Sequence, residues 1–125
     1  MENKRIPQEE FLYRRGYATP ERRFMNPDGS ATSRVFKLRE KDNGKLSVDV
    51  KSLTTPEKAI TNQNEFMLFE VSVSNVESIG LDSFYDPILP ENPAHAFIYG
   101  MDIDDETKAL LLAKKARRVF IKNPT

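Results

Sequence analysis

The residue best suited to acid–base chemistry is His95, the one histidine in a chain of 125 residues. An unperturbed imidazole titrates near neutral pH, and the proline-stiffened approach Asn92-Pro93-Ala94-His95-Ala96 is one way to fix such a group. The alternative is a structural histidine at the entrance of a strand, and we favour it because the sequence identifies no catalytic partner. His95 is therefore a candidate for both roles.

A nucleophile next to this histidine would have to be a serine or a threonine, since the chain contains no cysteine. Ser33, Ser47 and Thr55 are the candidates, and each has a simpler explanation in a turn, a strand or a helix cap. The sequence therefore assigns no catalytic triad.

Metal ions and nucleotide cofactors are not expected. One histidine without cysteine cannot supply the usual zinc ligands. The run from Met101 to Glu106 offers oxygen ligands but lacks the glycine and glutamate spacing of a calcium loop, so helix capping explains it better. The five glycines are scattered along the chain and form no phosphate-binding loop.

Charge is the most informative property of the chain, because it is sorted along the sequence. Residues 59–104 contain no lysine or arginine and carry a formal charge of about −8, whereas residues 1–58 and 105–125 each carry about +4. The sum is zero. This sorting marks four arginines and three carboxylates as candidate binding residues: Arg14, Arg15, Arg22, Arg23, Asp82, Asp86 and Glu91.

The basic flanks also raise the question of nucleic acid. Their cations could form a phosphate-binding face, with Tyr13 and Tyr17 available to stack on bases. A general nucleic-acid binder is usually a net basic domain, and this chain has as many carboxylates as cations. Nucleic acid is therefore a partner that we do not favour. The further cations of this hypothetical face are Arg34, Lys114, Lys115, Arg117 and Arg118.

The elements that must position these residues begin with a flexible N-terminus, residues 1–10, and a short strand at Phe11–Tyr13. Residues 14–33 are rich in turn formers and form the least regular stretch. Asn43-Gly44 predicts a hairpin between Val35–Leu38 and Leu46–Val50, because both turn residues tolerate positive φ. In the second strand the apolar residues alternate with Ser47 and Asp49, so one face should be buried and the other wet.

A helix is predicted to follow, capped by Thr55, opened by Pro56 and ending near Asn62. The apolar run Phe66–Val73 predicts a central buried strand. Ser74 is predicted to cap a single helical turn that ends at Gly80.

The last third predicts a proline-stiffened loop over residues 82–93 and a strand over residues 96–99. A longer helix should start with carboxylates at residues 104–106 and end with cations at residues 114–118, in agreement with the helix dipole. A short strand at residues 119–121 follows. We predict a single α+β domain over residues 11–122, with a mainly antiparallel sheet of four to six strands, one short helix and one longer C-terminal helix.

Four short sequence blocks of the chain resemble those of a family of small, uncharacterised bacterial proteins. The blocks are Leu12-Tyr13-Arg14, Leu46-Ser47-Val48-Asp49, Thr54-Thr55-Pro56-Glu57 and Asn92-Pro93-Ala94-His95-Ala96. The resemblance spans residues 11–118 and implies that the blocks belong together, with His95 and the capped Thr55 turn as family features. It implies no activity.

The chain is also distantly similar to small ADP-ribosyltransferase-like toxins, which have a Tyr-Arg strand near the start and a serine-bearing strand before a short helix. That resemblance implies that Arg14 contacts the phosphates of NAD and that Ser47 supports the nicotinamide ribose. Such folds need a late glutamate as well, for which the chain offers Glu70, Glu77 and Glu91.

The leading hypothesis is a non-enzymatic binding or accessory module of a bacterial system that docks on a protein partner through its charge-sorted surface. The alternatives are a small enzyme or toxin that uses Arg14, Ser47 and His95, and a nucleic-acid binder. No apolar stretch approaches the length of a membrane span, so the expected state is a soluble, cytoplasmic protein without a cofactor.

Overall fold

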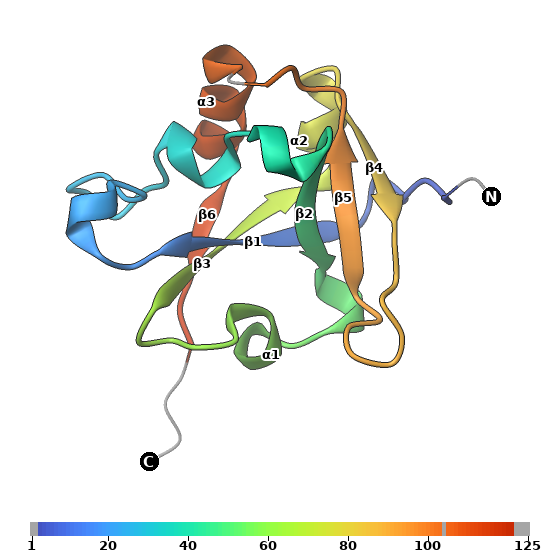
Figure 1. The fold of residues 1–125 in the computed structure, drawn as a ribbon, viewed down its shortest axis with the longest axis horizontal. Coiled ribbons are helices and arrows are strands. Elements are labelled where there is room, and N and C mark those ends of the chain that lie inside the picture. The colour runs from blue at the N-terminus through green and yellow to red at the C-terminus, as the bar shows by residue number, and fades with distance from the viewer. Residues whose placement is uncertain (1–2, 104, 122–125) are drawn as a thin grey trace.

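Six strands form one antiparallel sheet in the order β4-β5-β2-β1-β3-β6 (Figure 1). The computed structural model describes residues 3–103 and 105–121. The strands are β1 (Phe11–Tyr17), β2 (Lys45–Val50), β3 (Phe66–Ser72), β4 (Asp82–Tyr85), β5 (His95–Tyr99) and β6 (Arg117–Val119). The predicted α+β domain with an antiparallel sheet is confirmed.

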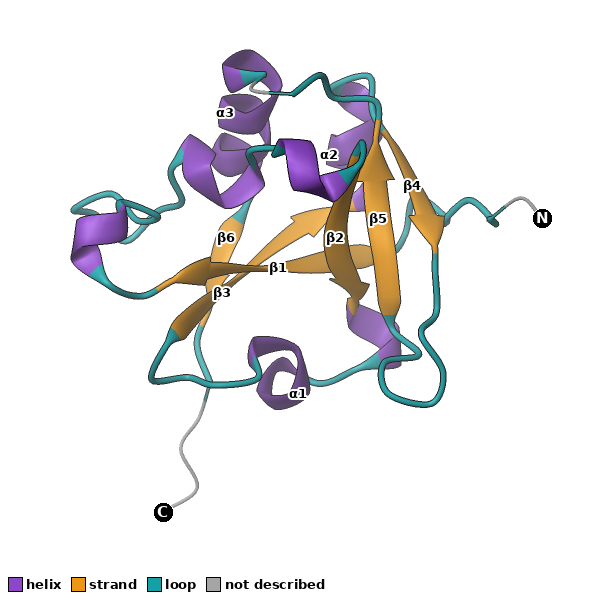
Figure 2. Ribbon diagram, in the orientation of Figure 1, coloured by secondary structure: helices purple, strands orange, loops and turns teal. Residues whose placement is uncertain are grey.

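The helices are short, apart from one near the C-terminus (Figure 2). They are α1 (Pro56–Ile60), α2 (Val73–Ser78) and α3 (Glu106–Lys115), with 3₁₀ turns η1 (Pro20–Arg22), η2 (Ser33–Phe36), η3 (Glu40–Asp42) and η4 (Lys51–Leu53). No described helix is long and apolar enough to cross a membrane.

The sheet is divided into two parts that meet at a narrow junction. β1 pairs with β3 along its whole length, and β2 pairs with β5 from Lys45 to Asp49. In contrast, β1 pairs with β2 at Leu12–Val50 and Tyr13–Asp49 alone. The two strands then separate, and Figure 1 shows β1 and β3 crossing β2 and β5 at a steep angle.

The main core lies on the face of the sheet that α2, α3 and η2 cover. Leu46, Val48 and Val50 are buried there, as their alternation with Ser47 and Asp49 predicts. Helix α3 contributes Leu112 to the same core. A smaller cluster on the other face joins residues of α1 to β1 and β3: Tyr13, Ala59, Ile60 and Leu68.

The two helices predicted from end signals are confirmed. Thr55 Oγ1 accepts a hydrogen bond from the backbone N–H of Lys58 at 3.3 Å, and Pro56 opens α1, which ends at Ile60. Asp105 Oδ1 accepts from the N–H of Lys108 at 3.0 Å and caps α3. Asp104, predicted to belong to the same start, lies outside the described residues.

The predicted hairpin is wrong, although its turn is correct. Asn43 and Gly44 both adopt positive φ, at 53° and 78°. However, Val35 and Phe36 belong to η2 and are fully buried against the core, so the segment predicted as the first strand of the hairpin is not a strand. β2 pairs instead with β1 and β5. The turn therefore forms as predicted, but packing of η2 against the core prevents the two flanking segments from pairing.

Several boundaries also differ from the prediction. The first strand extends to Tyr17, four residues into the stretch predicted to be irregular. The helical turn before Gly80 is capped by Ser72, whose hydroxyl accepts from the N–H of Asn75, and Ser74 lies inside it. Residues 82–85, predicted to be loop, form β4.

The last strand also differs from its prediction. Arg117 and Arg118, predicted to close the last helix, form β6 with Val119, so this strand starts two residues before the predicted one. The strand predicted to be central, β3, has β1 on one side and β6 on the other and is buried over most of its length.

The segment before β1 lies along β4 from Asn3 to Ile6. The Ile6 side chain is 1% exposed, and the Ile6 N–H donates to the carbonyl oxygen of Ser83 at 2.9 Å. Arg5 forms a bridge with Phe84. The N-terminal segment therefore borders β4 and contributes to the core.

Candidate functional site

Arg14 occupies the junction where β1 and β2 separate. Its Nε donates to the carbonyl oxygen of Val35 and its Nη1 to that of Ser47, both at 2.8 Å. Burial lowers the pKa of the Arg14 guanidinium to about 10, with the neighbouring charges of Arg39 and Arg15 acting in the same direction and that of Asp42 opposing them. Arg14 thus joins β1 to β2 by one side-chain hydrogen bond and to η2 by the other.

The three candidate catalytic residues, Arg14, Ser47 and His95, line one cavity of about 630 Å³. It lies between β1, β2, α1 and the loop before β5, and Glu91 on that loop lines it too. The pairing of β2 with β5 brings Ser47 and His95 together across 48 residues of sequence.

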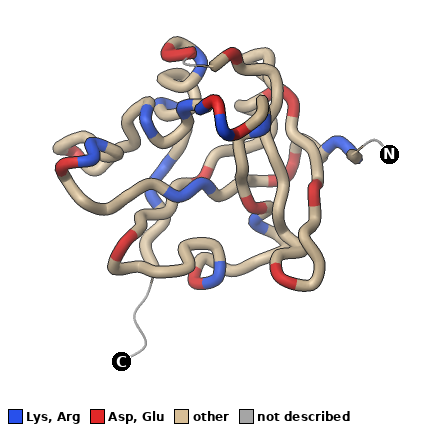
Figure 3. The backbone as a smooth tube through the Cα atoms, in the orientation of Figure 1, with Lys and Arg blue, Asp and Glu red and all other residues tan. Residues whose placement is uncertain are grey.

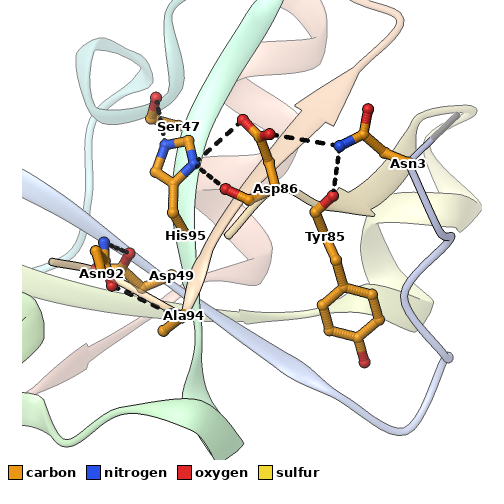
Figure 4. Close-up of polar contacts among 8 residues, drawn as sticks. All are labelled: Asn3, Ser47, Asp49, Tyr85, Asp86, Asn92, Ala94 and His95. Carbon is orange, nitrogen blue, oxygen red and sulfur yellow. Dashed lines mark hydrogen bonds and ion pairs between the residues drawn. The ribbon is translucent and has the colours of Figure 1, made fainter. Parts of the chain in front are cut away.

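The imidazole of His95 is held at both nitrogens (Figure 4). Nδ1 lies 3.0 Å from the backbone carbonyl oxygen of Asp86 and 3.3 Å from its Oδ2. Nε2 lies 3.3 Å from Ser47 Oγ. The partners that the sequence could not identify are therefore Ser47 on β2 and Asp86 directly after β4.

The loop before His95 is fixed by its own side chains. Asn92 Nδ2 donates to Asp49 Oδ1 at 2.8 Å, and Asn92 Oδ1 accepts from the N–H of Ala94 at 3.3 Å (Figure 4). The N–H of Asp86 donates to the carbonyl oxygen of His95 at 2.9 Å. The histidine is thus anchored from the two strands beside it and from its own loop.

A second cavity, of about 370 Å³, is lined by cations without a carboxylate among them. We call it the basic cavity. Its aromatic residues are Tyr17, Phe24 and Phe66. Figure 3 shows Lys and Arg positions on β1 and in the 3₁₀ turns that follow it, with Asp and Glu positions beside those in the turns. The cations of the basic cavity are Arg14, Arg15, Arg22, Arg34, Lys37 and Arg39.

Neutral groups hold three of these cations. Besides Arg14, Arg15 donates to the hydroxyl of Thr61 at 2.9 Å and lies over the ring of Phe66. The guanidinium of Arg22 stacks on Tyr17 at 4.1 Å from the ring centroid. Of the others, Lys37 lies 3.0 Å from Glu106 and Arg39 lies 3.9 Å from Asp42. The basic cavity therefore keeps an excess of positive charge.

The remaining predicted binding residues are dispersed. Arg23 lines neither cavity. Asp82 binds Arg5 at 2.7 Å, and Asp86 faces His95, so two carboxylates of the predicted acidic surface have partners within the chain. At the other end, Arg117 binds Glu70 at 3.2 Å and Arg118 contacts Met25. None of the four described cations Lys114, Lys115, Arg117 and Arg118 lines the basic cavity.

Sequence reasoning missed Lys37 and Arg39 as part of this cavity and Asp86 as the partner of His95. The cations at 34, 37 and 39 form a run that could have signalled a basic surface, but their position beside β1 depends on η2 packing against the core. Among the described residues, no group of three or more His, Asp or Glu side chains stands close enough to hold a metal ion.

Comparison with known proteins gives no match: no protein-family model, curated protein or solved structure matches the chain. The two resemblances noted from the sequence therefore stay predictions, and function has to be argued from the two cavities.

Proposed function

We propose that the protein is a binding module that takes an acidic segment of a partner protein into the basic cavity. The observation that carries the proposal is the trio Arg14, Arg15 and Arg22, three guanidinium groups around one cavity that are held by carbonyl, hydroxyl and ring partners. We also propose a cytoplasmic setting, since a chain without cysteine suits a reducing compartment.

Carboxylates are the ligand chemistry that this arrangement fits. A guanidinium presents its donors in a planar fork that matches a carboxylate in two parallel hydrogen bonds. Because the neutral partners fix these side chains in advance, little further side-chain entropy is lost when an anion binds. No carboxylate among the described residues bonds to the trio, so its charge stays available to a ligand.

The aromatic residues argue against nucleic acid as the partner. Tyr13, one of the two predicted stacking residues, is 3% exposed. Tyr17, the other, is covered by Arg22 and lies against Phe24 and Phe66, with ring centroids 5.5 Å and 5.1 Å away. A base would have to displace these contacts before it could stack.

The ADP-ribosyltransferase-like alternative has less support. Glu70 is buried against Lys51 and Arg117, and Glu77 accepts from Gln8. Of the three late glutamates, Glu91 is the one that lines the cavity of Ser47 and His95.

The test is a titration of the protein with a fluorescein-labelled deca-glutamate peptide, followed by fluorescence anisotropy at low and at physiological ionic strength. We expect saturable binding that weakens with salt, because the contact is between charges that water can screen. The double variant Arg22→Glu/Arg34→Glu should bind the peptide roughly tenfold more weakly or worse.

The matched control is Lys41→Glu/Lys114→Glu, which makes the same change in net charge at exposed positions outside the basic cavity. It should change the affinity much less. Equal losses of peptide affinity in the two double variants would mean that binding responds to the net charge of the protein and not to the basic cavity. Tighter binding of a labelled ten-residue oligothymidylate than of the peptide would overturn the proposal in favour of nucleic acid.

A further inference from the structure

The contacts of His95 determine which of its nitrogens carries the proton. The backbone carbonyl oxygen of Asp86, 3.0 Å from Nδ1, can only accept a hydrogen bond, so Nδ1 must donate. In the neutral imidazole the lone pair is then on Nε2, 3.3 Å from Ser47 Oγ, and the Ser47 hydroxyl donates to it. This is the arrangement of a general base poised on a hydroxyl.

A carboxylate lies behind the imidazole on the side away from the serine (Figure 4). Asp86 Oδ2 is 3.3 Å from Nδ1, and Asn3 Nδ2 contacts the other oxygen of this carboxylate at 3.4 Å. A negative charge in this position stabilises the imidazolium that forms when Nε2 takes a proton. Ser47, His95 and Asp86 therefore stand in the order nucleophile, base and positioning residue.

The serine and the histidine open onto space that a substrate could occupy. Both line the 630 Å³ cavity, and the Ser47 side is exposed to solvent. Arg14 and Arg15 line the same cavity, and Arg14 donates to the carbonyl oxygen of Ser47 itself. The cavity that Ser47 and His95 line thus also carries positive charge, which favours a substrate that develops negative charge.

We propose that Ser47 is a nucleophile that attacks small carboxylic esters. As Ser47 Oγ bonds to the ester carbonyl carbon, its proton moves to His95 Nε2. The carbon–oxygen bond to the alcohol then breaks, and the alcohol leaves with that proton. Water, deprotonated by the same Nε2, next attacks the acyl-serine, releases the carboxylic acid and restores the Ser47 hydroxyl. The proposal does not rest on ligand binding in the basic cavity, because Ser47 and His95 do not line it.

The first experiment incubates the intact protein with a fluorophosphonate probe and locates the adduct by mass spectrometry. We expect one adduct, on Ser47, and none in Ser47→Ala. Ser52 is the built-in control, since it is an exposed serine whose hydroxyl donates to a carboxylate, Glu10 Oε2 at 2.7 Å, without a histidine. Adducts spread over Ser52 and other serines, or no adduct on the folded protein, would overturn the proposal.

The second experiment tests whether His95 acts as the base that takes the proton of Ser47. His95→Gln can still hydrogen-bond to Ser47 but cannot take its proton, so labelling and the release of 4-nitrophenol from 4-nitrophenyl acetate should slow by roughly 10²-fold or more. Circular dichroism establishes that the variant is folded. Unchanged rates in a folded His95→Gln would refute the role of the histidine.

Asp86→Asn tests the positioning residue. The backbone carbonyl of residue 86 stays in place, so the ¹⁵N spectrum of the single imidazole should still report the tautomer with a proton on Nδ1. Loss of the carboxylate should nevertheless slow labelling of Ser47. A variant that keeps both the tautomer and the full labelling rate would remove Asp86 from the mechanism.

Discussion

The guanidinium of Arg14 donates to the carbonyl oxygen of Ser47 at 2.8 Å, at the point where their two strands cease to pair. This bond joins the two parts of the sheet and also separates the two cavities, because Arg14 lines both of them. One side chain therefore links the stability of the fold to the geometry of the candidate site.

Replacing Arg14 should cost stability. Arg14→Met leaves the carbonyl groups of Val35 and Ser47 without these donors, and we expect the free energy of unfolding to fall by about 1–3 kcal/mol. Arg14→Lys should recover only part of this loss, because an ammonium group lacks the planar fork that reaches both carbonyls. Urea denaturation measures both values. A Met variant as stable as the original protein would mean that desolvating the guanidinium cancels the gain from its hydrogen bonds.

Substituting the two cations that contact the buried carboxylate of Glu70 should have strongly non-additive effects on the free energy of unfolding. Its side chain is 3% exposed, and its carboxylate contacts Lys51 at 3.3 Å and Arg117 at 3.2 Å. Lys51→Met or Arg117→Met alone should lower the free energy of unfolding by about 1 kcal/mol or less, since the other cation still balances the carboxylate. The double variant should lose on the order of 3–5 kcal/mol, because it leaves a buried charge without a partner.

Thermal or urea unfolding of the single and double variants measures the departure from additivity. Arg5→Met is the control, because it breaks a 2.7 Å ion pair with Asp82 in which both side chains are largely exposed. It should cost less than about 1 kcal/mol. If the losses of stability in the Lys51 and Arg117 variants simply add, then one cation does not balance the Glu70 carboxylate when the other is removed.

The parts of the fold that the sequence predicts best are those whose cause is local. Thr55-Pro56 specifies the start of α1, and the carboxylates around Asp105 specify the start of α3, because a cap and a dipole act within one turn. The Asn43-Gly44 turn is local as well and forms as expected. The hairpin around it does not form, because which strands pair depends on residues far away in sequence.

The candidate site illustrates the same limit. Ser47 and His95 are both recognisable as reactive types, but their contact depends on the register of β2 against β5, in which Asp49 faces His95. Asp86 reaches the imidazole only because residues 82–85 form β4 beside β5 rather than a loop. Residue types could therefore be proposed from sequence, whereas the partners could not.

A pH-dependent contribution to stability is expected from Glu106 in the first turn of α3. Lys37 Nζ donates to Glu106 Oε1 and Ser33 Oγ to Oε2, both at 3.0 Å. These hydrogen bonds, with the charge of Lys37, hold the pKa of the Glu106 carboxyl below its ordinary value. Because the pKa is lower in the folded than in the unfolded chain, the stabilisation is complete above the unfolded pKa of about 4.3 and is lost as pH falls through the folded pKa.

Glu106→Gln should therefore be less stable than the original protein at pH 7, and the difference should shrink as the pH falls below about 4. Urea denaturation from pH 7 to pH 3 measures this difference. Glu57→Gln is the matched control, since Glu57 also lies in the first turn of a helix but has no ammonium or hydroxyl partner among the described residues. A Glu106→Gln deficit that stays constant down to pH 3 would show that the ionised carboxylate is not what joins α3 to η2.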